Sequence, residues 1–343
     1  MTKFYEVVEN VVRDGDHCTF FYEAGDPDGP VIIFVHGWPE LSISWRNQLP
    51  IMASLGFRAI APDMRGYGRS TIYQNHKDYA QEHVVADMLA LLDSLGVEKA
   101  LWVGHDWGSP TVWSIASHHP NRCLGLVSLC VPYHTLEYGL EACVSLIDRN
   151  LYPESDFPFG QWEYQKFYEE DFAKAVATFD ADPYLSIKAL FRAGKPKPPD
   201  RPNFTALVRE DSGWFGGASV APDVPRDNSI ISETDLLSYS TYLKRNGFFG
   251  PCSYYMNHAA NEEYSAQAIN GGALELPVLF LEAAYDYTCE CSVSKLATPM
   301  EQYCSNLTKV VVSSGHWMAQ ERPAEVNAAL VQWMARSLPA IWP

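Results

Sequence analysis

The chain has 343 residues, 47% of them hydrophobic, and its 42 acidic against 25 basic side chains give a formal net charge of −17 at pH 7. This length suits one large α/β unit that carries an insertion. Nucleic acids and anionic membranes attract clustered Lys and Arg, so the acidic balance argues against both as partners. Neither a membrane span nor an apolar signal core is visible, and the scattered cysteines indicate free thiols, so we expect a soluble, cytoplasmic protein.

Strand-like and helix-like segments alternate over residues 1–133. Apolar runs predict strands at 31–35, 57–61, 100–103 and 124–129. Between the second and third of these strands, apolar positions from Val84 to Leu95 fall on one helical face, and Gly96 ends that helix. This alternation predicts an α/β fold with a mostly parallel central sheet flanked by helices.

The pattern changes after residue 133. Residues 134–272 are rich in Tyr, Phe, Pro and acidic side chains, and they combine helical periods with irregular loops. The first pattern then returns, with two strands and a closing helix expected at 276–281, 309–312 and 325–336. We therefore expect a core built from 1–133 and 273–343, interrupted by a mainly helical cap at 134–272.

The most informative motif is Gly104-His105-Asp106-Trp107-Gly108, which lies between the strand at 100–103 and a helix. Its glycines flank the central residue as in G-x-S-x-G, where they permit a strained turn that lifts a nucleophile above the sheet. An ionised carboxylate can attack a saturated carbon and form an ester that water cleaves, whereas serine alkylated at that carbon gives a stable ether. Asp106 therefore indicates displacement at carbon, the alternative being a turn with a solvated or capping aspartate.

Three further loops are expected at the same edge of the sheet. His36-Gly37-Trp38-Pro39 follows the strand at 31–35, and the Trp38 and Trp107 amides can together form an oxyanion hole above Asp106. Asp286 and His316 follow the last two strands, where Asp286 can orient the imidazole.

The chain order of nucleophile, acid and histidine is that of the α/β-hydrolase fold. A Gly-Pro turn or a single histidine is more often structural, so the assignment depends on the convergence of all four loops.

Taken with the segment Asp63–Ser70, these motifs resemble the soluble epoxide hydrolases of the α/β-hydrolase superfamily, nearly end to end. The resemblance implies an α/β-hydrolase fold with a helical cap that supplies two tyrosines to the epoxide oxygen. Tyr164 and Tyr239 stand where the family has its first and second cap tyrosines. Tyr168 and Tyr242 are the rival positions.

The mechanism that the resemblance implies also follows from the residue types. Asp106 opens the epoxide while Tyr164 and Tyr239 stabilise the departing oxygen, and His316, held by Asp286, then activates water to cleave the ester. We expect an apolar epoxide and water as reactants, a vicinal diol as product, no cofactor or metal, and a monomer or homodimer. The expected substrate-binding residues are Pro39, Trp107, Phe157, Phe159, Trp317 and Met318.

Three alternatives stay open on the sequence. Haloalkane dehalogenases share the aspartate nucleophile, but they commonly have Asn where this chain has Trp38, and they lack the cap tyrosine pair. Fluoroacetate dehalogenases place Arg where this chain has Trp107. A catalytically silent binding protein could keep the scaffold, although all three residue types of the triad are present. Release of a diol or of a halide separates the enzymes, and neither product would indicate the binding protein.

Overall fold

The computed structural model describes residues 6–198 and 200–343. Its strands form one eight-stranded sheet in the order β1-β2-β4-β3-β5-β6-β7-β8. Neighbouring strands from β4 through β8 in this order are parallel, and their bounds are β3 Val31–Val35, β4 Arg58–Pro62, β5 Ala100–His105, β6 Cys123–Leu129, β7 Val278–Ala283 and β8 Leu307–Val312. These six strands are the ones that the apolar runs predict.

The remaining two strands were not identified as strands from the sequence. β1 (Val8–Asp14) and β2 (His17–Gly25) form a hairpin, and β2 pairs antiparallel with β4 at the edge of the sheet. Residues of β1 are largely exposed, so the strand lacks the continuous apolar run of a strand buried on both faces.

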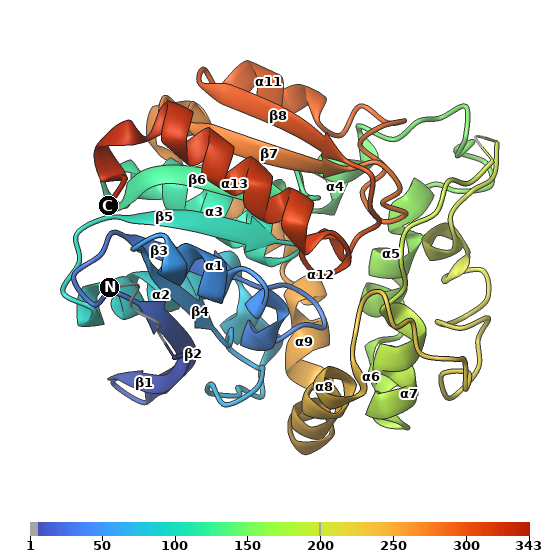
Figure 1. Cartoon of the computed structure of the whole chain (residues 1–343). Coiled ribbons are helices and arrows are strands. Elements are labelled where there is room, and N and C mark those ends of the chain that lie inside the picture. The colour runs from blue at the N-terminus through green and yellow to red at the C-terminus, as the bar shows by residue number, and fades with distance from the viewer. Residues whose placement is uncertain (1–5, 199) are drawn as a thin grey trace.

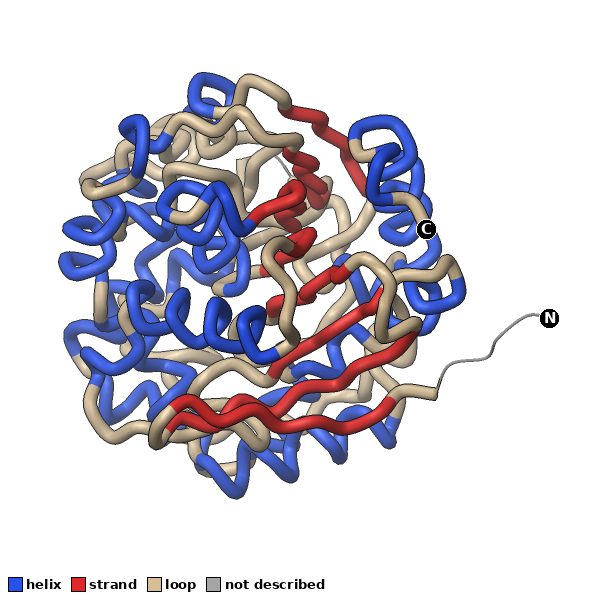
Figure 2. Tube along the Cα trace, turned by 90° about the vertical axis from the view of Figure 1, so that its left-hand side faces the viewer, coloured by secondary structure: helices blue, strands red, loops and turns tan. Residues whose placement is uncertain are grey.

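Helices cover both faces of the sheet (Figures 1 and 2). Ile32 and Phe34 of β3 pack with the helices α1 (Leu49–Ser54) and α13 (Pro323–Ser337), whereas Ile33 and Val35 pack with α2 (Gln81–Ser94) and α3 (Gly108–His118). Successive side chains of a strand point to opposite faces, so a strand covered on both sides is apolar throughout. The predicted fold class is confirmed.

Between β6 and β7 the chain leaves the sheet, and we call this insertion, residues 130–277, the cap. The cap contains α4 (Leu140–Val144), α5 (Glu163–Glu170), α6 (Phe172–Asp180), α7 (Pro183–Leu190), α8 (Glu233–Asn246), α9 (Phe249–Ser253) and α10 (His258–Ser265). In Figure 1 the strand arrows point toward α5, α6 and α7, so the cap lies beyond the C-terminal ends of the parallel strands. The boundaries at 134 and 272 stay a prediction.

The two ends of the cap meet. The Tyr133 hydroxyl donates a hydrogen bond to the Gly272 carbonyl at 2.8 Å, which joins the outgoing and returning segments of the chain. Beyond the cap, the short helices α11 (Thr298–Tyr303) and α12 (Met318–Glu321) flank β8 in the sequence. Across residues 6–198 and 200–343, none of the helices has the length and apolar character to cross a membrane.

Candidate active site

Asp106 lies on a strained turn between β5 and α3. Its φ of +48° is in the left-handed region that side chains rarely adopt. Glycines make the turn possible, because a β-carbon on Gly104 would lie 2.5 Å from the Gly108 carbonyl oxygen and one on Gly108 would lie 2.1 Å from that of Val35. The turn therefore packs tightly on β3 and presents the carboxylate at the C-terminal edge of the sheet.

The loop after β3 brings a backbone donor to this carboxylate. The Trp38 N–H donates to Asp106 Oδ1 at 2.6 Å. A β-carbon on Gly37 would lie 2.4 Å from Asp106 Oδ1 and 2.6 Å from the Trp107 nitrogen, so only glycine allows this approach. Trp107 stands at the N-terminus of α3, where amides have no partner within the helix. Both amides thus lie where negative charge on Asp106 can be stabilised.

His316 lies between two aspartates. Its Nε2 is 3.4 Å from Asp106 Oδ2, and its Nδ1 is 3.1 Å and 3.2 Å from the two carboxylate oxygens of Asp286. Asp286 is held in turn by the amides of Thr288 at 2.7 Å and Cys289 at 3.3 Å. All three side chains are buried, and the structure brings them together in the order nucleophile, base and acid.

The charges of the three groups are coupled. Burial alone would lower the pKa of His316, but the Asp286 and Asp106 carboxylates raise it well above its usual value. Burial alone would raise the pKa of Asp286, but His316 lowers it. The two carboxylates therefore favour the protonated form of His316. Conversion of Asp106 to an uncharged ester removes one of them, which favours the neutral imidazole that a general base requires.

A buried pair behind His316 supports the catalytic loops. His105 Nδ1 lies 2.7 Å from Glu40 Oε2, and His105 Nε2 donates to the His316 carbonyl oxygen at 2.8 Å. Glu40 also accepts from the Gln320 amide at 3.1 Å and from the Gly37 N–H at 3.2 Å. The loops after β3, β5 and β8 are thereby linked. We did not identify this pair from the sequence, although His105 is part of the Asp106 motif and Glu40 directly follows Pro39.

Burial would lower the pKa of His105, but Glu40 raises it to about 10. Burial would raise the pKa of Glu40, but His105 lowers it to about 2. The stabilisation from His105 is complete below its unfolded pKa of about 6.5 and is lost as the pH rises toward the folded value. The stabilisation from Glu40 is complete above its unfolded pKa of about 4.3 and is lost as the pH falls. The pair therefore contributes most between these two unfolded values.

The Glu40→Gln variant should be less stable near pH 6 and should lose less stability than the wild type on going to pH 9.5. Without Glu40, His105 lacks the carboxylate that raises its pKa. Raising the pH then removes less of the stabilisation that a charged His105 contributes to the folded state. Thermal melting of both proteins from pH 6 to 9.5 measures the difference in slope. Parallel curves would contradict the charged state of the pair.

Among the described residues, His105, Cys130 and His316 have ligand-type atoms within 4.8 Å of one another. The nitrogens of both rings already face protein partners: Glu40 and a carbonyl oxygen for His105, and two aspartates for His316. Metal binding here would break those contacts, so the group is better suited to holding and moving protons.

Tyr164 of α5 faces the nucleophile. It lines a cavity that Asp106, His316 and Trp38 also line. The Gln165 amide donates to its phenolic oxygen at 3.0 Å, which leaves the phenol proton available for a ligand. Burial and, after it, the Asp106 carboxylate raise the pKa of Tyr164 well above its usual value. Tyr164 is therefore a neutral hydrogen-bond donor at physiological pH.

The structure corrects the prediction for Tyr239. The hydroxyl of Tyr239 lies 2.6 Å from Ser44 Oγ and donates to Gln320 Oε1 at 3.4 Å. The ring packs on Phe191, with centroids 5.1 Å apart. The inward face of α8 thus docks on the loop after β3 and on α12. The Tyr239 hydroxyl is hydrogen-bonded there and does not line the cavity at Asp106.

Tyr255 takes the place that we expected for Tyr239. It belongs to the turn Tyr254–Met256 after α9, and it lines the cavity with Tyr164, the two rings 5.7 Å apart. Burial, followed by Tyr164 and Asp106, raises its pKa well above the usual value. Of the rival residues, Tyr168 stacks on Tyr255 at 4.6 Å. The available signal in the sequence was the aromatic pair Tyr254-Tyr255, a few residues beyond the motif that indicated Tyr239.

Trp317 is the one predicted substrate-binding residue that lines this cavity. The other predictions fall outside its lining: Pro39, Trp107, Phe157, Phe159 and Met318. Trp107 packs against Tyr254 and Tyr255, and Met318 lies in the core on the α13 face of the sheet. Phe157 packs on Tyr152, and Phe159 lies beneath cationic side chains of the cap. Aromatic composition alone does not reveal which ring faces the ligand.

Asp63, in the motif Asp63–Ser70, has a structural role. It accepts from the Ser42 amide at 2.9 Å, the Ser42 hydroxyl at 2.6 Å and the Arg69 amide at 2.9 Å. These bonds fix the segment that continues from the Trp38 loop. The motif therefore supports the shape of the site without reaching the cavity.

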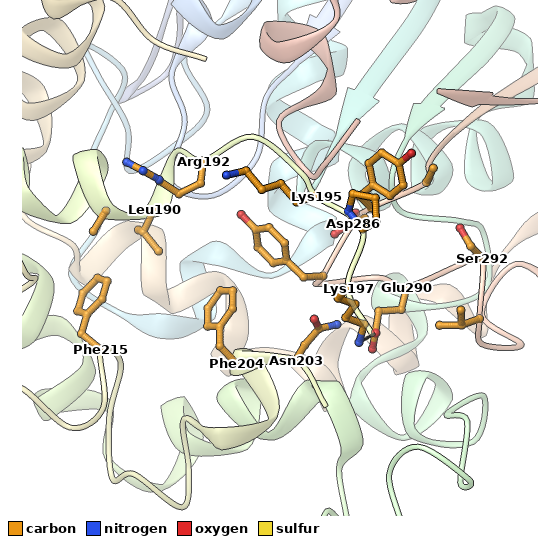
Figure 3. A pocket seen from close by; sticks show the side chains of 16 residues that line it. Leu190, Arg192, Lys195, Lys197, Asn203, Phe204, Phe215, Asp286, Glu290 and Ser292 are labelled. Carbon is orange, nitrogen blue, oxygen red and sulfur yellow. Dashed lines mark hydrogen bonds and ion pairs between the residues drawn. The ribbon is translucent and has the colours of Figure 1, made fainter. Parts of the chain in front are cut away.

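Two cavities meet at the site. The inner one, of about 30 Å³, contains Asp106, Tyr164 and His316 in its wall. The outer one, of about 630 Å³, lies between the cap and the loop that carries Asp286 (Figure 3). Asp106 lines the inner cavity and not the outer one, and Leu190, Phe204 and Tyr287 line both.

Comparison with known proteins agrees with this geometry. A family described as alpha/beta hydrolase fold matches residues 30–323. Epoxide hydrolase A of Mycobacterium tuberculosis is 31% identical over 91% of this chain and 92% of its own length. Epoxide hydrolase 3 of Siraitia grosvenorii is 31% identical over 88% of this chain and 90% of its own length.

Solved structures give the same picture. Epoxide hydrolase A from Mycobacterium thermoresistibile has a TM-score of 0.76 at 28% identity, covering 96% of this chain and 99% of that one. An epoxide hydrolase from Vigna radiata has a TM-score of 0.77 at 27% identity, covering 96% of this chain and 98% of that one. The chain belongs to the α/β-hydrolase fold family, and the four relatives named above, which it covers along 90–99% of their length, are epoxide hydrolases.

Proposed function

We propose that this protein hydrolyses an apolar epoxide to a vicinal diol through a covalent ester on Asp106. One observation carries the proposal: two buried, neutral phenols, Tyr164 and Tyr255, share the wall of one small cavity with Asp106 and His316. Two phenols suit a reaction in which a carboxylate attacks a carbon atom while negative charge develops on the oxygen that leaves that carbon.

In the first step, Asp106 Oδ attacks one epoxide carbon and the carbon–oxygen bond of the ring breaks. The two phenols hydrogen-bond the departing oxygen, and one of them gives it the proton that makes the first hydroxyl. The phenolate regains a proton from the His316 imidazolium, which leaves the imidazole neutral. In the second step, neutral His316 removes a proton from water, and the resulting hydroxide attacks the Asp106 carbonyl carbon. The Trp38 and Trp107 amides stabilise the oxyanion until the ester bond breaks. The released alkoxide takes the proton of the His316 imidazolium to become the second hydroxyl, the new Asp106 carboxyl returns its proton to His316, and the diol leaves. Asp286 stabilises the imidazolium that forms.

A haloalkane dehalogenase is the second candidate. A departing halide needs no proton, so a dehalogenase would not require two neutral phenols as proton donors. The Trp107 indole, which could hold a halide, packs against Tyr254 and Tyr255 and is not part of the cavity wall. Incubation with styrene oxide and, separately, with a 1-chloroalkane tests the choice. We expect diol from the first and no chloride from the second. Chloride without diol would favour the dehalogenase, and neither product would favour a binding protein.

The two phenols should act as a pair. Loss of one hydrogen-bond donor to a developing oxyanion costs about 2.7–4 kcal/mol, or roughly 10²–10³ in rate. Because one phenol partly replaces the other, Tyr164→Phe and Tyr255→Phe should each retain measurable kcat/KM, and the double variant should be nearly inactive. Tyr239→Phe is the matched control, since its hydroxyl contacts Ser44. A large loss of kcat/KM in Tyr239→Phe, together with normal kinetics of Tyr255→Phe, would show that Tyr239 is the second phenol that stabilises the departing oxygen.

We also propose an apolar substrate and a cytoplasmic location. Trp38, Trp214 and Trp317 supply apolar surface to the inner cavity. All eight cysteines are free thiols, as expected in a reducing compartment. The oligomeric state, monomer or homodimer, stays a prediction.

A further inference from the structure

We infer that the inner cavity accepts only the unsubstituted end of an epoxide and that the outer cavity binds the substituent. Terminal epoxides with one extended apolar tail are then the preferred substrate class. This inference rests on the proposed epoxide hydrolysis and specifies its substrate.

The inner cavity is too small for a second substituent. Its volume is about 30 Å³, and one water needs roughly 10–15 Å³, so the space matches about two waters. The side chains of its walls cannot readily move apart, because the Trp38 ring stacks on Trp214 at 5.7 Å and packs edge-on against Tyr255 at 6.1 Å. Closely packed aromatic walls resist added volume, since an extra methylene in a filled site forces its neighbours to move.

Three side chains define the passage between the two cavities. Leu190, Phe204 and Tyr287 line both cavities. The core holds Leu190 in place, because the Trp317 indole N–H donates to the Leu190 carbonyl at 3.0 Å. The rings of Phe204 and Tyr287 lie 5.1 Å apart, which joins the cap to the loop of the catalytic acid. The width of the passage is therefore set by these side chains.

The outer cavity has the size and surface for a tail. Its volume of about 630 Å³ lies within the range of roughly 300–1,000 Å³ that ligand cavities show. Figure 3 shows Leu190, Phe204 and Phe215 on one side of it. Phe204 and Val293, which also line it, are 47% and 50% exposed, so both present apolar surface to solvent. An apolar tail would remove that surface from water.

This arrangement fixes the orientation in which the substrate binds. With the tail in the outer cavity, the ring enters through the passage and its unsubstituted carbon points into the closed end, near Asp106. An epoxide within a chain would have to place a second carbon substituent in the closed end, where the packed aromatic rings stand.

The test uses three isomers of one composition: 1,2-epoxyoctane, trans-2,3-epoxyoctane and trans-4,5-epoxyoctane. They have the same number of carbons, so only the position of the ring differs. We expect kcat/KM to fall at least tenfold from the first to the last. Leu190→Ala and Phe204→Ala should each raise the 4,5- to 1,2-isomer ratio at least fivefold. Phe204 is 47% exposed, so replacing it with alanine should destabilise the fold little.

Leu237→Ala is the matched control, because Leu237 is 51% exposed on α8 and lines neither cavity. Its isomer ratio should equal that of the wild type. Equal rates for all three isomers, or faster opening of the 4,5-isomer, would overturn the inference and leave the proposed function standing. An unchanged ratio in both passage variants would also overturn it. Absence of diol from every isomer would instead contradict the proposed function.

Discussion

Replacing Asp106 with alanine is expected to lower epoxide turnover by roughly 10⁴-fold or more, the scale seen when a covalent nucleophile is removed. Without the carboxylate, no ester forms, and the triad has no substrate for its second step. The fold should survive, although alanine at a φ of +48° costs about 1–2 kcal/mol and the Trp38 amide loses its acceptor. Diol formation from a terminal epoxide, together with thermal melting, measures both effects.

Asp211→Ala is a suitable control for this variant, because Asp211 is an exposed aspartate of the cap. It should match the wild type in turnover and melting temperature. If the Asp106→Ala enzyme kept more than about a tenth of the wild-type rate, a covalent role for Asp106 would be refuted.

Replacing His316 with glutamine should separate the two chemical steps. Opening of the epoxide needs the Asp106 carboxylate and the phenols, whereas cleavage of the ester needs a base that removes a proton from water. The variant should therefore form the ester and fail to release it. Intact-mass spectrometry after substrate addition should show a gain of one substrate mass, and peptide mapping should place it on the segment with Asp106.

His83→Gln, at an exposed histidine of α2, should turn over normally and show no added mass. An inactive His316→Gln enzyme that never gains the substrate mass would show that His316 acts before or during opening of the ring. A gain of mass on a different peptide would move the nucleophile away from Asp106.

Much of the core was predictable because its signals are local. A strand buried on both faces has to be apolar at every position, and the strand from Val31 to Val35 has that pattern. The turn at Asp106 needs glycines at both flanks for the close contacts that the structure shows. Loops that follow parallel strands meet at one edge of a sheet, so the meeting of Asp106, Asp286 and His316 follows from topology.

The cap was less predictable, because its contacts join segments that are distant in sequence. Tyr239 and Tyr255 both follow helical patterns, and the choice between them depends on which face of α8 docks on Ser44. The aromatic residues expected to bind substrate posed the same problem: Phe157 packs on Tyr152, whereas Trp317 lines the inner cavity. Side-chain direction in such segments is decided by tertiary packing rather than by local pattern.

The contact between Tyr133 and Gly272 has an evolutionary consequence. The bond holds the outgoing and returning segments together, and strands β6 and β7 pair directly with each other, so the sheet itself is formed without the residues between Tyr133 and Gly272. The entropy of closing a loop rises only slowly with its length, so segments of different length and sequence can replace one another there at small cost to the sheet. Positions such as Leu190 and Phe204, which line both cavities, can therefore change while Asp106, Asp286 and His316 keep their places at the edge of the sheet. Selectivity can thus evolve through the rest of this segment, provided that the two phenols, Tyr164 and Tyr255, stay beside Asp106.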